Sequence, residues 1–266
     1  MTVSGFVQNA EKYAQYLGTI EGRLRLDLTL AGMREFLPLA IAAKPRRALD
    51  VGGGTAAAAI HLAGLNFDVT LLDHSDSMLA MAQRAACEAG VDERISFRRG
   101  DASDLRHMFQ GEMFDVVLCH NLLEYVDDPH SAVQACAQLM KGDSASLLSV
   151  LTRNRWGEVL KSALRSHDLG TAERMLEAEW ATESLYGGDV RLFSPHEIVE
   201  MMQQATLSMI AQRGVRVLAD YLPEQLLRGD QYKQLFELEL KLGGRAEFSS
   251  IARYTHSFCA KADPRT

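Results

Sequence analysis

From Arg47 onward, short apolar runs alternate with longer segments whose apolar residues recur at helical spacing. A short apolar run is typical of a buried strand, and a spacing of three or four residues is typical of an amphipathic helix. Strands and helices that alternate with short connections predict a parallel, doubly wound α/β sheet. The first five strands are expected at 48–51, 69–73, 95–98, 114–120 and 145–151, and the helices between them at 55–62, 75–90, 104–109 and 128–141.

The pattern continues on both sides of this core. Residues 6–16 and 21–39 have helical spacing and are expected to lie over the core as two helices. Ser194-Pro195-His196-Glu197 predicts a capping box with proline at the first helical position, which starts a helix to about Ala205. The remaining elements are expected to be helical segments at 156–169 and 172–185, strands at 207–210 and 254–260, and a helix at 223–242. Seven strands result.

Composition indicates what kind of protein carries this pattern. The 266 residues are 47% apolar and 24% charged, which is enough for one large α/β core with an appendage. No stretch approaches the ~20 apolar residues of a membrane span, and the first residues lack the pattern of a signal peptide, so neither is expected. Four scattered cysteines fit reduced thiols in a cytoplasmic protein without a metal site. The net charge of −7 argues against broad non-specific nucleic-acid binding.

A glycine-rich turn follows the first strand. Asp50 and Val51 lead into Gly52-Gly53-Gly54, and a helix begins shortly afterwards. Glycine tolerates positive φ and has no Cβ, so the backbone can approach a ligand closely. Asp73 ends the next strand, where a carboxylate can accept hydrogen bonds from both hydroxyls of a ribose. The turn lacks the Gly-Lys-Ser/Thr of a P-loop, which excludes a triphosphate site of that kind. Three glycines alone would also fit a tight turn without a ligand.

Polar residues also follow the third and fourth strands, namely Asp101 and Ser103, and then His120. Each alone could be a helix cap or a strand-end histidine. The carboxyl ends of parallel strands meet at one edge, so these groups are expected to surround a ligand together with the glycine turn. The turn resembles motif I of the class I S-adenosylmethionine (AdoMet) methyltransferases, with Ala56 in place of the third glycine. The segment 114–129 is similar to motif IV of the same enzymes.

Over most of its length the chain resembles one family, the tRNA 5-carboxymethoxyuridine methyltransferases. The resemblance is carried by residues 16–25, 49–54, 120–129, 214–222, 235–239 and 252–256. It implies a class I methyltransferase (Rossmann-like) fold with a seven-stranded, mostly parallel sheet, an antiparallel last strand and AdoMet as cofactor. The domains are then expected to be an N-terminal helical lid at 1–40, an AdoMet-binding core at 41–152, a helical insertion over the substrate pocket at 153–192, and the C-terminal half of the sheet at 193–266.

The resemblance also implies which residues bind the cofactor. The family pattern matches Arg25, Gly52, Gly53, Asp73, Ala102, Ser103 and His120, and the expected binding set is completed by Asp50, Gly54, Ser75, Met78 and Asp101. Arg25 precedes the first strand by more than 20 residues, so its inclusion implies that the N-terminal helices close over the carboxylate of AdoMet.

Arginines and tyrosines gather in the segments where a doubly wound enzyme builds its substrate pocket. A guanidinium group matches carboxylate or phosphate in bidentate geometry, so the cluster suggests an anionic acceptor. Ordinary surface charge is the alternative for any one of them. No residue is assigned to catalysis, and the candidates for positioning the acceptor are Tyr16, Arg153, Asn154, Arg155, Arg216 and Tyr221.

The sequence leaves the acceptor open. The family implies the wobble 5-carboxymethoxyuridine of a tRNA anticodon loop, esterified by in-line methyl transfer to a carboxylate. A carboxylate is ionised at pH 7 and needs no general base. The insertion from Leu169 to Asp189 is acidic where members of that family have lysines, so a small-molecule O- or N-methyltransferase acting on an anionic metabolite is the alternative. A third hypothesis is a protein that binds AdoMet or its product without catalysis.

Overall fold

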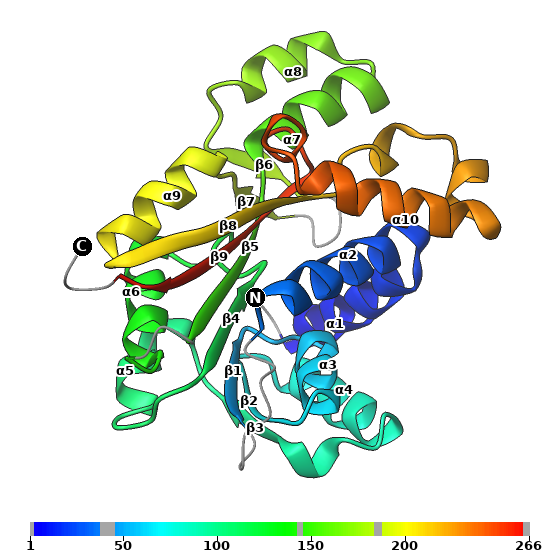
Figure 1. The fold of residues 1–266 in the computed structure, drawn as a ribbon. Coiled ribbons are helices and arrows are strands. Elements are labelled where there is room, and N and C mark those ends of the chain that lie inside the picture. Colours follow the sequence, from blue (N-terminus) through cyan, green and yellow to red (C-terminus); the bar gives the residue numbers. More distant parts are fainter. Residues whose placement is uncertain (1–2, 38–45, 143–145, 184–187, 263–266) are drawn as a thin grey trace.

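A seven-stranded, mostly parallel sheet runs through the molecule, with helices on both of its faces (Figure 1). The computed structural model describes residues 3–37, 46–142, 146–183 and 188–262. The strands lie in the order β3-β2-β1-β4-β5-β9-β8. Their bounds are β1 (Arg46–Val51), β2 (Phe67–Asp73), β3 (Ile95–Arg99), β4 (Val116–His120), β5 (Leu147–Arg153), β8 (Leu207–Val215) and β9 (Tyr254–Lys261).

The strand order reverses beside β1, which pairs in parallel with both β2 and β4. Asp50 therefore lies opposite Leu71 on one side and Leu118 on the other. The β2–β3 and β4–β5 pairs are also parallel, whereas β9 is antiparallel to both of its neighbours. This is the class I methyltransferase sheet, and the predicted fold class is confirmed. A reversal of strand order opens a crevice at the carboxyl edge, where ligands of such sheets bind.

Each face of the sheet has its own apolar core because successive strand residues point to opposite faces. Leu49 and Val51 of β1 face one core, and Ala48 faces the other. The first core is covered by α5 (Leu105–Met108), α6 (Pro129–Leu139) and α9 (Pro195–Gln204). The second core is covered by α3 (Ala57–Gly64) and α4 (Asp76–Glu88).

The N-terminal helices α1 (Val3–Gly18) and α2 (Ile20–Phe36) pack beside the sheet, between α3 and the C-terminal helix α10 (Asp230–Gly243) (Figure 1). Leu24 and Leu28 of α2 form a third core with Leu151, Val215 and Leu235. A short helix, α11 (Ala246–Ser249), precedes β9. The N-terminal segment is thereby fixed against the carboxyl edge of β5, close to the predicted site.

The insertion after β5 lies beyond this carboxyl edge. It consists of α7 (Arg155–Leu160), a π-helical turn (Lys161–Arg165), α8 (Leu169–Met175) and a two-stranded antiparallel sheet of β6 (Trp180–Thr182) and β7 (Asp189–Arg191). The helix predicted at 172–185 is wrong from Leu176 to Glu183, and residues 184 and 185 lie outside the described part of the chain. Strand pairing with β7 and the stacking of Arg191 on the Trp180 ring at 4.8 Å replace helical contacts there.

Other element boundaries also differ from the prediction, among them the following three. The helix predicted at 223–242 is divided into a 3₁₀ turn (Glu224–Leu227) and α10, because Gly229 adopts a φ of +61°, which only glycine accepts readily. The strand predicted at 207–210 continues to Val215, because it stays paired with β9 as far as Tyr254. The helix predicted to reach Leu39 ends at Phe36, and residues 38 and 39 lie outside the described part of the chain.

Candidate functional site

The glycine turn crosses from β1 onto the end of β2. The backbone N–H groups of Gly52 and Gly53 both donate to the carbonyl of Leu72, at 2.8 and 3.1 Å. A Cβ on Gly53 would lie 2.6 Å from the Leu71 side chain and 2.9 Å from Asp50 Oδ2, so no side chain fits. Ala56, at the place of the third motif glycine, has a φ of +67° directly before α3. The turn therefore keeps a glycine-like backbone at a residue that is not glycine.

Asp73 is held at the carboxyl end of β2 by the same turn. Its Oδ2 accepts from the N–H of Gly54 at 3.0 Å, and its Oδ1 accepts from the N–H of Ser75 at 2.9 Å. Ser75 in turn caps α4 by accepting from the N–H of Met78. The side chain of Asp73 is 6% exposed and lines the large cavity of the molecule. A carboxylate oriented by two backbone donors can still accept from two hydroxyls of a ligand.

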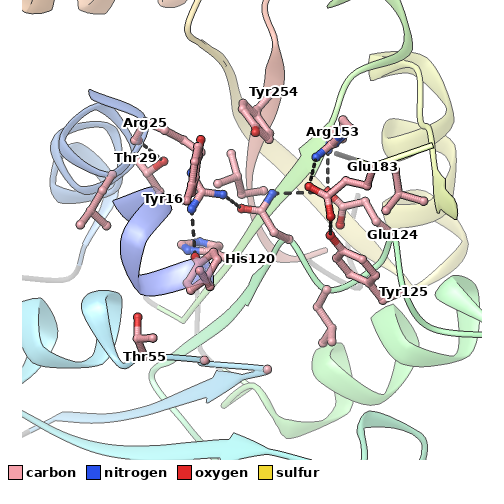
Figure 2. A pocket seen from close by; sticks show the side chains of 18 of the residues that line it. Tyr16, Arg25, Thr29, Thr55, His120, Glu124, Tyr125, Arg153, Glu183 and Tyr254 are labelled. Carbon is pink, nitrogen blue, oxygen red and sulfur yellow. Dashed lines mark hydrogen bonds and ion pairs between the residues drawn. The ribbon is translucent and has the colours of Figure 1, made fainter. Parts of the chain in front are cut away.

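The large cavity has a volume of about 1020 Å³ and extends along the carboxyl edge from the glycine turn to the insertion. Figure 2 shows side chains that line it. It is large enough for a nucleoside cofactor together with part of an acceptor. The predicted site residues that line it are Tyr16, Arg25, Asp50, Gly52, Gly53, Gly54, Asp73, Ser75, Met78, His120, Arg153 and Arg216.

Six predicted site residues do not line this cavity. Asp101 caps the 3₁₀ turn Ala102–Asp104 by accepting from the N–H of Ser103 at 2.8 Å, and this hydrogen bond lowers the pKa of its carboxyl group. Asn154 is fully buried and donates to the carbonyls of Ser250 and Ala252. The six residues are Asp101, Ala102, Ser103, Asn154, Arg155 and Tyr221.

Arg25 is a buried cation that reaches the cavity from α2. Its Nη1 donates to Asn121 Oδ1 at 2.6 Å and its Nη2 donates to Tyr13 Oη at 2.9 Å, while the side chain is 6% exposed. Both partners are uncharged, and no carboxylate of the described residues lies within ion-pair distance of it. A buried charge needs an opposite charge nearby. The carboxylate of the methionyl part of AdoMet would supply that charge, so the residues present fit this cofactor.

Asp50 lies behind the glycine turn with an exposure of 2%. Burial and the negative charge of Asp73 raise its pKa to about 7. Its Oδ2 has no hydrogen-bond partner among the described residues. A cation bound at the turn, such as the ammonium or sulfonium of AdoMet, would lower this pKa again.

His120 joins the cavity to the buried centre of the sheet. Its Nε2 is 2.8 Å from Ser149 Oγ, and the same oxygen is 2.7 Å from Nε2 of the fully buried His256. Burial and the charge of Arg25 lower the pKa of His120 to about 3. The imidazole is therefore neutral near pH 7, and it cannot act as a general acid there.

The acceptor end of the cavity is dominated by four arginines around one tyrosine. We call Arg25, Arg153, Arg216 and Arg253 the arginine cluster. The guanidinium groups of Arg25, Arg216 and Arg253 lie within 6.0 Å of the ring centroid of Tyr254. Burial raises the pKa of Tyr254, but the arginine cluster outweighs burial and lowers this pKa to about 8. The potential at the hydroxyl is therefore strongly positive.

Several residues of this end were missed from the sequence, among them Arg253 of the arginine cluster. Glu183 is 5% exposed; its Oε1 is 2.9 Å from Arg153 Nη2, and its Oε2 accepts from Tyr125 Oη at 3.2 Å (Figure 2). Glu124 accepts from the N–H of Arg153 at 2.7 Å, and burial raises its pKa. Tyr254 belongs to a stretch, 252–256, that the family resemblance contains, and this was the one available signal for it.

Two further properties of the described residues concern membranes and metal ions. None of their helices is long and apolar enough to cross a membrane. Within the same ranges, no group of three or more His, Cys, Asp or Glu side chains is arranged to hold a metal ion.

Comparisons with known proteins support the chemistry of the cavity. Residues 49–148, from β1 into β5, match the methyltransferase domain family. The chain is 28% identical over 256 residues to the tRNA 5-carboxymethoxyuridine methyltransferase of Escherichia coli (strain K12), covering 93% of this chain and 92% of that one. It is 33% identical over 173 residues to the ubiquinone biosynthesis O-methyltransferase of Aromatoleum aromaticum (strain DSM 19018 / LMG 30748 / EbN1), covering 64% of this chain and 67% of that one.

Solved structures of methyltransferases share the fold. A magnesium protoporphyrin IX methyltransferase from Synechocystis PCC 6803 with bound SAH superposes with a TM-score of 0.63 at 12% identity, covering 95% of this chain and 94% of that one. A SAM-dependent methyltransferase from Thermotoga maritima gives a TM-score of 0.62 at 15% identity, covering 98% and 100%. At such low identity the likeness concerns the fold. Together with the domain match and the sequence relatives, it identifies the chain as a member of the class I AdoMet-dependent methyltransferases.

Proposed function

We propose that the enzyme transfers the methyl group of AdoMet to the carboxylate of 5-carboxymethoxyuridine in the anticodon loop of tRNA. The relative in Escherichia coli (strain K12) whose name states this activity matches the chain over nearly its whole length. The structural observation that carries the proposal is the convergence of the arginine cluster on Tyr254 at the acceptor end.

A carboxylate acceptor suits this end because of its charge. The lowered pKa of Tyr254 reports a positive potential strong enough to outweigh the cost of burying a phenolate. The same potential stabilises a carboxylate that enters from the cavity. Arginine is the side chain best matched to carboxylate because its N–H donors are arranged as a planar fork.

The mechanism then needs positioning more than proton transfer. AdoMet supplies an electrophilic methyl group on a sulfonium. A carboxylate with a reference pKa near ~4 is already ionised at pH 7, so no residue must remove a proton from it. His120 is neutral and hydrogen-bonded to Ser149, which suits a residue that orients a ligand. Arg153, Arg216 and Arg253 would hold the acceptor in line with the methyl group, and such alignment supplies much of the rate enhancement.

The cofactor would lie along the glycine turn. Arg25 would bind its carboxylate, and Asp73 would accept hydrogen bonds from the ribose hydroxyls. The backbone of Gly52, Gly53 and Gly54 allows the close approach that a side chain would block. The remaining residues proposed to contact or support the cofactor are Asp50, Ser75, Met78, Asp101, Ala102, Ser103 and His120.

A second candidate is methylation of a small anionic metabolite, and the surface of the insertion favours it. Glu173, Glu177, Glu179 and Asp189 are all exposed on this segment. Such a surface repels the phosphates that a tRNA brings to the pocket. The relatives named ubiquinone biosynthesis O-methyltransferases also match the chain, over about two thirds of its length.

One experiment separates the two candidates. Purified enzyme and labelled AdoMet are incubated with tRNA that carries 5-carboxymethoxyuridine, and the nucleosides are analysed by mass spectrometry. The proposal predicts the methyl ester of 5-carboxymethoxyuridine. Absence of the ester at low salt, with AdoMet binding demonstrated by calorimetry, would refute the tRNA substrate. Ester formation on small carboxylates in that case would favour the second candidate.

A further inference from the structure

Three of the four arginines of the cluster already have protein carboxylates as partners, and the fourth, Arg25, is proposed to bind the carboxylate of AdoMet. Side-chain ion pairs join Arg153 to Glu158 at 3.2 Å, Arg153 to Glu183 at 2.9 Å, Arg253 to Glu158 at 2.5 Å, and Arg216 to Asp220. A carboxylate that enters this end must therefore take an arginine from one of these partners. The identity of the partner that gives way determines which acceptors the enzyme accepts.

Glu183 is the partner whose place in the fold suits exchange. Glu158 belongs to α7 and pairs with both Arg153 and Arg253. Asp220 lies in the turn directly after β8, within the main body of the molecule. Glu183 instead directly follows β6 of the separate two-stranded sheet and lines the cavity beside Arg153. Only its side chain has to rotate to release Nη2 of that arginine.

The carboxylate of Glu183 has the kind of hydrogen-bond donors around it that a bound ligand carboxylate would have. Each of its two oxygens has one donor, Arg153 on one side and Tyr125 on the other. A guanidinium and a phenol hydroxyl that converge on a carboxylate make a recognition site of ordinary composition. The site is therefore complete, but a side chain of the protein itself fills it.

Resting on the proposed function, we propose that Glu183 is a specificity-determining residue that occupies the position of the acceptor carboxylate against Arg153. Arg153 already pairs with Glu158 through Nη1 and with Glu183 through Nη2, and both would repel a third carboxylate, so an incoming carboxylate has to displace Glu183 from Nη2. A small free carboxylate has few other contacts to offset this displacement. A nucleotide within an RNA has many other contacts that offset it. The cost lowers the affinity for both by the same factor, so Glu183 leaves a small carboxylate too weakly bound to occupy the site, whereas the RNA, with its further contacts, still binds.

The first test compares binding of two nucleosides to the enzyme in the presence of S-adenosylhomocysteine. Glu183→Gln keeps the shape and the acceptor oxygen for Tyr125 but removes the charge. It should tighten the binding of 5-carboxymethoxyuridine by about tenfold in calorimetry, because a charged competitor for Arg153 is lost. Neutral 5-methoxyuridine should bind the variant and the wild type equally. Glu179→Gln, an exposed change of the same charge on the same insertion, should leave both affinities unchanged.

A role of Glu183 that is only structural predicts the opposite sign. If Glu183 merely held the insertion in place, Glu183→Gln would leave the affinity for 5-carboxymethoxyuridine unchanged or weaken it. Either result overturns the inference, as does equal tightening by Glu179→Gln.

The second test needs no acceptor. Glu183→Ala leaves a space of carboxylate shape beside Arg153, which acetate can enter. Sodium acetate should raise the melting temperature of Glu183→Ala relative to sodium chloride of equal ionic strength, and it should not do so for Glu179→Ala. Equal responses of the two variants overturn the inference. Methyl ester formation is measured separately, so that a gain in carboxylate binding without any ester would refute the proposed function while the role of Glu183 stands.

Discussion

Arg25 and Asn121 are 96 positions apart in the sequence, yet the guanidinium of one donates to the side-chain oxygen of the other at 2.6 Å. The contact joins α2 to the loop after β4 at the edge of the cavity. It fixes a buried cation whose described partners are all uncharged, and it explains why an N-terminal helix belongs to the site of a methyltransferase.

Arg25→Ala should weaken AdoMet binding by about 1.5 to 3 kcal/mol, the range for a hydrogen bond to a charged group. Titration calorimetry measures the effect. Arg23→Ala is the matched control, because Arg23 lies on the same helix with a 70% exposed side chain. Equal affinities of the two variants would remove Arg25 from the cofactor site.

Asp73→Asn should lower the affinity for AdoMet by roughly 1.5 to 3 kcal/mol, because the charged acceptor for the ribose hydroxyls is lost. The amide oxygen still accepts one of the two backbone N–H groups, so the turn should remain folded. The comparison ligand is methionine. It has no ribose, so its affinity should be the same for the variant and the wild type. A loss of affinity that is the same for both ligands would indicate a general disturbance of the site.

The affinity for an anionic acceptor should fall as the pH rises through about 8. Tyr254 is neutral below its pKa of about 8 and becomes a phenolate above it, which places a negative charge within the arginine cluster. KM for 5-carboxymethoxyuridine-bearing tRNA should therefore rise between pH 7.5 and 9, with little change in kcat. Tyr254→Phe should abolish this rise. A KM profile that is the same in both enzymes would show that Tyr254 does not titrate in this range.

Asp50→Asn should stabilise the cofactor-free protein at pH 8. The raised pKa of Asp50 means that the folded state binds a proton more tightly than the unfolded state. Stability from this group is then fully present below about pH 4 and is lost as the pH rises through 7. The variant has no carboxyl group to ionise at this position, so it does not lose this stability as the pH rises. Its unfolding free energy at pH 8 should therefore exceed that of the wild type by about 1 to 3 kcal/mol. Urea unfolding at pH 5 and pH 8 measures the effect, and a gain that does not depend on pH would contradict this explanation.

The parts of the site that follow directly from local pattern could be predicted from the sequence. The positions of the glycine turn and of Asp73 follow from the ends of two strands, and both line the cavity. Side-chain direction beyond a strand end could not be predicted in the same way. Arg153 lines the cavity, whereas the next residue, Asn154, begins α7 as its N-cap and donates to the backbone carbonyls of Ser250 and Ala252.

Contacts between segments that are far apart in the sequence could not be predicted from the sequence pattern. The inclusion of Arg25 came only from the family resemblance, because its place depends on how α2 packs against β5 and β8. Glu183 appeared within a segment of helical spacing, and its place next to Arg153 depends on a strand pair that overrides that spacing. The sequence pattern therefore did not distinguish Glu183 from the exposed acidic residues of the insertion.

The chain of His120, Ser149 and His256 has a consequence for hydrogen positions. The Ser149 hydroxyl has one proton and two lone pairs, and with these two described partners its proton is hydrogen-bonded only when it donates to one imidazole and accepts from the other. Both imidazoles are neutral, because burial lowers the pKa of each. Their Nδ1 atoms must then differ, one carrying a proton and the other a lone pair. Nδ1 of His256 is buried without a partner, and a buried lone pair costs less than a buried unpaired N–H. The fold thereby sets His120 in the tautomer whose Nδ1–H is a donor, through a residue that no ligand in the cavity touches.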